Sequence, residues 1–161
     1  MPAPFARLLD VLAQAAVAIA GASIVGMAMT EAWQVFARYV LDDSPSWTEP
    51  VALLLMSMAM MFGAATGVRA NRHFGFFILV EASSPRARRV LQWLSVSIAG
   101  GVGLMLMLWG GAMAVDAWGY PMAGAPLPQG LAFLPMCLGG ALIAAFAVEQ
   151  GLRSGVAPAG R

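Results

Sequence analysis

Four long stretches without a charged residue divide the sequence, and they constrain its fold more than any other feature. Residues 11–30, 50–68, 90–115 and 117–148 contain no Asp, Glu, Lys or Arg. A transmembrane helix needs about 20 mostly apolar residues to cross about 30 Å of hydrocarbon. Each stretch is long enough to cross a membrane once. The last cannot cross twice, because its first third contains three prolines, which interrupt helices.

We therefore expect an all-α integral membrane protein with four transmembrane helices in a single domain over residues 1–161. The expected spans are about 8–32, 48–68, 88–115 and 128–150. Composition agrees, because 60% of the residues are hydrophobic and only 11% are charged, against about a quarter charged in an average soluble domain. Only short tails and connections are left outside the membrane, so no independent soluble domain is expected.

The basic residues are all arginines, and their distribution predicts the orientation. One arginine precedes the first span, five lie between the second and third spans, and two follow the fourth. These are Arg7; Arg69, Arg72, Arg86, Arg88 and Arg89; and Arg153 and Arg161. The other two connections contain only Arg38. Because arginines collect on the cytoplasmic side of membrane proteins, we expect both termini and the central connection in the cytoplasm. Arg86, Arg88 and Arg89 are expected to set topology and to bind anionic lipid, with a partner contact second.

The connection between the second and third spans includes an apolar run, residues 74–80 (FGFFILV), which is too short to cross a membrane. Two interpretations remain open. The run lies along the membrane surface as an interfacial segment, or it forms a loop beneath the helices.

Local signals predict where the helices begin. The second helix can begin with a capping box of Ser46 and Glu49, or with Thr48 as the N-cap, because Pro50 disfavours helical geometry at Glu49. Pro85 suits the first position of the third helix. In the fourth helix, Pro135 is expected to produce a kink near residues 131–135.

Small residues spaced four apart predict close helix contacts, because helices in lipid approach closely where side chains are small. The strongest candidate is the pair Gly63 and Gly67 in the second span. The sequence leaves open whether that contact is internal or with a partner. Similar but weaker pairs are Ala99 with Gly103 and Gly140 with Ala144.

Residues that carry chemistry are nearly absent. The chain has one His, one Cys and no Lys, which excludes a bis-histidine haem and leaves too few ligands for a zinc site. We expect no cofactor, no metal and no enzymatic activity. Every charge falls at or near the end of a span, whereas transport pathways are marked by ionisable residues inside the membrane. This pattern favours a subunit that supports transport by another protein.

Several motifs resemble the small membrane subunit, the Q or DctQ type, of TRAP (tripartite ATP-independent periplasmic) transporters. They are Glu31, the run FARYVL at 36–41, SWTE at 46–49, Gly63, Gly67, Arg69 and His73. The sequence departs from the family at Pro50 and Phe77, where the family often has acidic residues.

The resemblance implies four helices in a bacterial inner membrane, with both termini inside. It also implies a large membrane subunit that carries the sodium and substrate sites and moves as an elevator. A soluble periplasmic protein would deliver a carboxylate. The small subunit would enlarge the fixed scaffold and bind no substrate, so this chain alone does not identify the substrate.

The resemblance also assigns candidate contacts, each with a simpler alternative. Trp47 either anchors the chain at the membrane surface or contacts the large subunit. Glu49 either caps its helix or pairs with Arg38 or with an arginine of the partner. Arg38 either snorkels toward the membrane surface or, because it shares a helix face with Glu31, forms a polar cluster with Glu31 and Glu49. His73 is expected to be an interfacial or capping residue.

Two other classes of function remain possible. A small multidrug exporter also has four helices, but it needs a carboxylate deep within the first span, and Glu31 lies at the outer end of that span. A non-transport assembly subunit of an unrelated complex is the other alternative.

Overall fold

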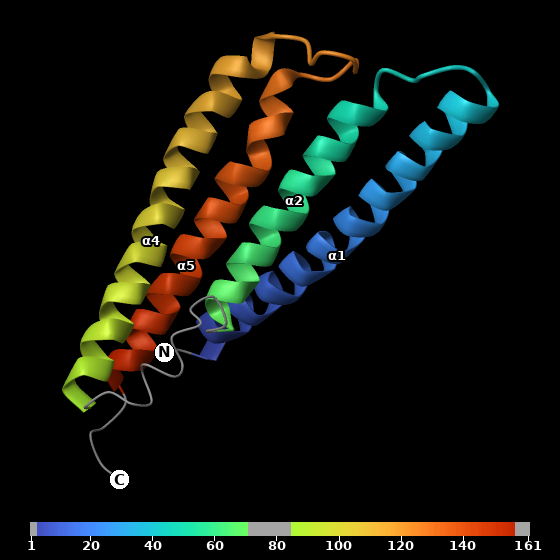
Figure 1. Ribbon diagram of the computed structural model, residues 1–161. Coiled ribbons are helices and arrows are strands. Elements are labelled where there is room, and N and C mark those ends of the chain that lie inside the picture. The colour runs from blue at the N-terminus through green and yellow to red at the C-terminus, as the bar shows by residue number, and fades with distance from the viewer. Residues whose placement is uncertain (1–2, 71–84, 157–161) are drawn as a thin grey trace.

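The computed structural model describes residues 3–70 and 85–156, and this part of the chain is dominated by long helices (Figure 1). They are α1 (Ala3–Val40), α2 (Thr48–Arg69), α4 (Pro85–Asp116) and α5 (Leu134–Val156), with 3-10 turns η1 (Ala117–Gly119) and η2 (Gln129–Phe133). All four long helices are long and apolar enough to cross a membrane. The expected all-α fold with four spans is therefore confirmed.

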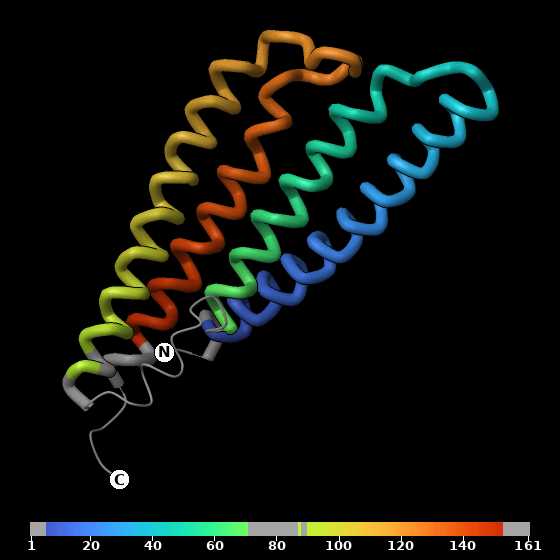
Figure 2. Tube along the Cα trace, viewed as in Figure 1, coloured from blue at the N-terminus to red at the C-terminus, as the bar shows by residue number. Residues whose placement is uncertain are grey.

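The helices form a row in which α1 packs on α2, α2 on α5, and α5 on α4. α1 begins and α5 ends at the same end of the row, which we call the terminal end. The connections 41–47 and 120–128 lie at the opposite end, which we call the loop end. α1 and α2 lie close together at the terminal end and diverge toward the loop end (Figure 2).

The hydrophobic core lies toward the terminal end, where side chains of all four long helices meet. One cluster joins Leu9 of α1, Ala65 and Val68 of α2, Ala99 of α4 and Phe146 of α5. Burying such side chains stabilises a core by about 1.5–3 kcal/mol each in water, although packing rather than hydrophobicity drives helix association in lipid. The loop-end half of α1 lacks an equivalent cluster among the described residues.

Glycines place α4 and α5 in direct backbone contact. A Cβ at Gly140 would lie 2.6 Å from the backbone nitrogen of Met107 and 2.7 Å from the carbonyl oxygen of Gly103. At Gly103, a Cβ would lie 2.7 Å from the backbone nitrogen of Ala144. The weaker small-residue candidates therefore mark the close contact. By contrast, a Cβ at Gly63 would meet nothing within 4 Å, so Gly63 makes no tight contact with the described part of the chain.

The two predicted caps of α2 are both wrong. Trp47 occupies the N-cap position and makes no side-chain cap hydrogen bond. The hydroxyl of Thr48 donates backward to the carbonyl of Pro45 at 2.9 Å. The hydroxyl of Ser46 donates to the carbonyl of Gly124 at 3.0 Å. Tertiary contact with the other loop therefore takes Ser46 away from the role that its local sequence suggests.

The predicted kink at Pro135 takes a different form. Residues 129–133 form the 3-10 turn η2, and the α-helical pattern starts at Leu134. Pro135 consequently lies in the first turn of α5, where its missing N–H leaves no helical hydrogen bond unmade. α4 begins at Pro85, as the sequence predicts.

The loop between α4 and α5 is folded on itself and joins the two halves of the row. The amide of Gln129 donates to the carbonyl of Tyr120 at 2.8 Å, and that of Met122 to the carbonyl of Leu127 at 2.7 Å. Gly124 has a positive φ of 85°, which only glycine adopts at little cost. A Cβ there would lie 2.5 Å from the carbonyl oxygen of Ser46, so the loop can approach the α1–α2 connection only with glycine here.

The interfacial segment expected at 74–80 and His73 lie outside the described residues. Arg86, Arg88 and Arg89 belong to the first turns of α4, but their side chains are outside the description.

Candidate functional site

The described ion pairs converge on Arg69, the last residue of α2. The amide of Ala70 closes the helix by donating to the carbonyl of Thr66 at 3.0 Å. A cation in the final turn is also favoured by the negative end of the helix dipole. The local sequence thus places a guanidinium at the terminal end, beside the neighbouring helices.

Two carboxylates from other helices meet this guanidinium. Its Nη2 lies 2.5 Å from Oδ1 of Asp10 on α1. Its Nε lies 3.0 Å from Oε2 of Glu149 on α5, and Nη2 lies 3.4 Å from Oε1 of the same carboxylate. The contact with Glu149 is therefore two-pronged, which is the geometry that guanidinium groups favour with carboxylates.

Further contacts extend this Arg69 cluster, which we define as Asp10, Arg69, Glu149 and Gln150. The side-chain amide of Gln150 donates to the carbonyl of Val68, at the end of α2. The guanidinium carbon of Arg69 lies 5.4 Å from the ring centre of Phe146, within the range of a cation–π interaction. Three helices thus share one polar junction.

Burial differs sharply between the two carboxylates. The side chain of Glu149 is 1% exposed and that of Asp10 is 58% exposed. A buried carboxylate that loses its partner is costly, by about 3–5 kcal/mol, whereas exposed ion pairs contribute about 0–1 kcal/mol. The Arg69–Glu149 contact, which joins α2 to α5, is therefore the energetically important one.

The sequence motifs indicated Arg69 but neither Asp10 nor Glu149. A signal was present, because each acid borders a charge-free stretch, Asp10 before 11–30 and Glu149 after 117–148. Both sit on the side expected to be rich in arginine, where an acid is conspicuous.

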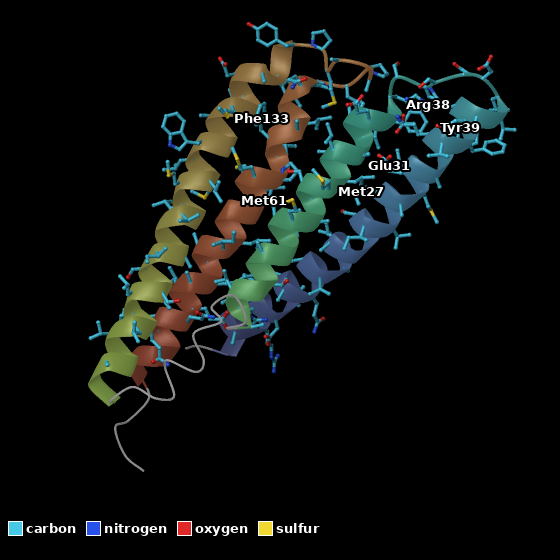
Figure 3. All side chains as sticks on the ribbon, in the orientation of Figure 1. Met27, Glu31, Arg38, Tyr39, Met61 and Phe133 are labelled. Atoms are coloured by element: carbon cyan, nitrogen blue, oxygen red, sulfur yellow. The ribbon has the colours of Figure 1, made fainter. Side chains whose placement is uncertain are left out.

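The expected polar cluster at the other end does not form. Glu31, Arg38 and Glu49 are all exposed, and within residues 3–70 and 85–156 none of their side chains makes an ion pair or hydrogen bond. Figure 3 shows Glu31 and Arg38 on the loop-end half of α1, where that helix diverges from α2. Trp47 is 42% exposed at the start of α2. Contacts of these residues with a partner stay a prediction.

Gly63 and Gly67 border a shallow, open groove between α1 and α2. The groove has a volume of about 990 Å³ and lies next to the Arg69 cluster. Its walls are Asp10, Ala13, Gln14, Val17 and Ala18 of α1, and Gly63, Thr66, Gly67, Arg69 and Ala70 of α2. Most of these side chains are small, so backbone atoms are accessible from outside. Among the described residues, no group of three or more His, Cys, Asp or Glu is placed to hold a metal ion.

Four membrane-length helices, with charged groups only near their ends in the described ranges, define a multi-pass membrane subunit. Residues 27–154 match the family of tripartite ATP-independent periplasmic transporters, DctQ component, and the chain belongs to this family. The C4-dicarboxylate TRAP transporter small permease protein DctQ of Vibrio cholerae serotype O1 is 24% identical over 105 residues. That match covers 62% of this chain and 45% of the relative, so less than half of the relative's length is matched.

Proposed function

We propose that this small TRAP subunit supports a large, sodium-coupled membrane subunit as part of its fixed scaffold. In this proposal the complex takes up a carboxylate that a periplasmic binding protein delivers. The Vibrio cholerae relative is a C4-dicarboxylate small permease by name, which supports a carboxylate substrate. The structure of this chain contributes a separate argument about its own role.

The observation that carries the proposal is the position of the charges. On α1, Asp10 and Glu31 are separated by 20 uncharged residues, Val11–Thr30, and α2 carries no charge between Glu49 and Arg69. Ionisable residues inside a span mark the pathways of ions and charged substrates. Within the described helices charged residues occur only near the ends, so substrate and sodium would be handled by another chain.

Reconstitution tests this division of labour. Liposomes are prepared with the large subunit, this chain and the binding protein, and sodium-driven carboxylate uptake is compared with that of each membrane subunit alone. We expect uptake from the complete system and none from this chain by itself. Uptake by the lone chain would reject the scaffold role, and full uptake without it would show that it is dispensable.

We further propose that the loop end faces the periplasm, in a bacterial inner membrane, with the terminal end in the cytoplasm. The excess of arginines beside the terminal ends of the helices supports this orientation. In a Cys137→Ala background, a cysteine at position 43 or 123 should react from outside with a membrane-impermeant thiol reagent. A cysteine at position 87 should not react, and labelling there from outside would reverse the orientation.

A further inference from the structure

One flank of α1 is exposed over the whole length of the helix. Asp10, Val17, Ile24, Glu31 and Arg38 recur every seven residues, which is close to two helical turns, so they follow one another along the surface. Val17 and Ile24 are 59% and 55% exposed, and the other three are exposed as well. We call this row the docking flank.

The docking flank borders the stripe by which α1 packs on α2. That stripe includes Ala16 and Ala20, which are 1% and 9% exposed and pack with Phe62 of α2. The docking flank is therefore exposed although the adjacent stripe of the same helix is packed against α2. Asp10 of the flank pairs with Arg69, whereas the other two charged residues, Glu31 and Arg38, have no ion pair among the described residues.

The docking flank also forms part of the groove between α1 and α2. Asp10 and Val17 line the groove together with Gly63 and Gly67. A Cβ at Gly63 would meet nothing within 4 Å, so another backbone can approach α2 closely there. Two of the five flank residues thus line a concave surface, and the other three continue beyond it toward the loop end.

Charge distinguishes a protein occupant from a lipid chain. Glu31 and Arg38 lie two turns apart on this flank with opposite charges and no ion pair within the described ranges. Near the membrane surface a headgroup or water can solvate either charge singly, but a lipid does not match the order of the two charges along the helix. A helix with a basic side chain opposite Glu31 and an acceptor opposite Arg38 compensates both, and their order fixes its register.

The length of the flank fits a membrane-spanning helix. Asp10 and Glu31 are 21 residues apart, about 31 Å along a helix, which matches about 30 Å of hydrocarbon. The polar groups of the flank therefore lie near the two membrane surfaces, with apolar Val17 and Ile24 between them. A helix running alongside would meet the same sequence of environments.

We propose that the docking flank and the adjoining groove bind one transmembrane helix of the large subunit, which places a basic side chain opposite Glu31 and a hydrogen-bond acceptor opposite Arg38. This inference rests on the proposed function, since it assumes that the large subunit is the partner. The inference adds which surface of this chain contacts the large subunit.

Site-directed photo-cross-linking in membranes that contain the complete transporter tests the surface. A photoreactive residue replaces Val17 or Ile24 on the docking flank, or Ala15 or Ala22 as controls. The control positions are also exposed, and a displacement of two residues turns them by about 200° around the helix. We expect adducts with the large subunit from positions 17 and 24 and not from 15 and 22.

Charge variants test the pairing independently. Glu31→Gln and Arg38→Gln are each expected to weaken co-purification with the large subunit about tenfold, because removing one member of a desolvated charge pair mainly speeds dissociation. Asp43→Asn, an exposed acid of the loop end outside the flank, should leave co-purification unchanged. Co-purification of both glutamine variants at the unmodified level would overturn the pairing.

The outcomes separate the two proposals. If the unmodified chain co-purifies with the large subunit but cross-links from positions 15 and 22, the docking flank is wrong while the proposed function stands. Adducts from 17 and 24 only with lipid, or only with a second copy of this chain, also overturn the inference. If the unmodified chain does not co-purify with the large subunit at all, the proposed function itself fails.

Discussion

The two helical hairpins are held together in different ways. α4 and α5 meet backbone to backbone through Gly103 and Gly140, and their connecting loop is folded on itself. α1 and α2 meet through alanines near the terminal end, as with Ala16 and Ala20 against Phe62. Toward the loop end they diverge.

The difference suggests that one hairpin uses its small residues for internal packing, whereas the other leaves them accessible to a partner protein. In lipid, helices associate through close backbone packing rather than through the hydrophobic effect. The α4–α5 hairpin is therefore stabilised by its own internal contacts. The α1–α2 hairpin has its most open small-residue positions, Gly63 and Gly67, on the wall of a groove. The same type of sequence motif is internal in one hairpin and external in the other.

The largest expected effect is at the junction between the hairpins. Arg69→Met keeps a long side chain but leaves the buried Glu149 carboxylate without its guanidinium. We expect a loss of about 3–5 kcal/mol in the free energy of unfolding, measured by thermal unfolding in detergent. Arg7→Met, which removes an exposed arginine at the same end of the molecule, is the matched control. Equal stability of the two variants would mean that the Arg69 cluster does not hold the hairpins together.

Paired glycine substitutions test the contrast between the hairpins directly. Gly140→Ala places a Cβ 2.6 Å from the backbone nitrogen of Met107 and should destabilise the chain by about 1–3 kcal/mol. Gly63→Ala places a Cβ in open space and should leave the isolated chain as stable or up to about 1 kcal/mol more stable, because alanine favours a helix. The measurement is again thermal unfolding in detergent. A destabilising Gly63→Ala would remove the distinction between internal and external glycines.

The sequence predicted the number of helices, because the length of a charge-free stretch reflects the thickness of the membrane and can be read residue by residue. It did not predict which small residues meet, since Gly63 and Gly140 have similar local sequences and differ only in what lies opposite them. The Arg69 cluster could not be predicted from local sequence patterns either. Asp10 and Glu149 are 59 and 80 residues from Arg69 along the chain, and only the order of helices in the row brings them together.

Helix packing also explains why the polar cluster predicted at the loop end does not form. Glu31, Arg38 and Glu49 are near in sequence and are expected near one surface of the membrane, which favours a cluster. The divergence of α1 from α2 leaves them apart within the described chain. Spacing on one helix could be predicted, but the angle between two helices depends on packing along their whole length.

The smallest expected effect concerns the tie between α1 and the rest of the row. Asp10 is much less buried than Glu149, since its side chain is 58% exposed. Exposed ion pairs contribute about 0–1 kcal/mol to stability. Asp10→Asn should therefore lower the free energy of unfolding by less than about 1 kcal/mol. In an Arg69→Met background it should have no further effect, because the partner is already gone. A double-mutant cycle in detergent measures this coupling. A coupling as large as the Arg69→Met effect itself would mean that α1 is held as firmly as α5, and the contrast between the two hairpins would then apply only to their loop ends.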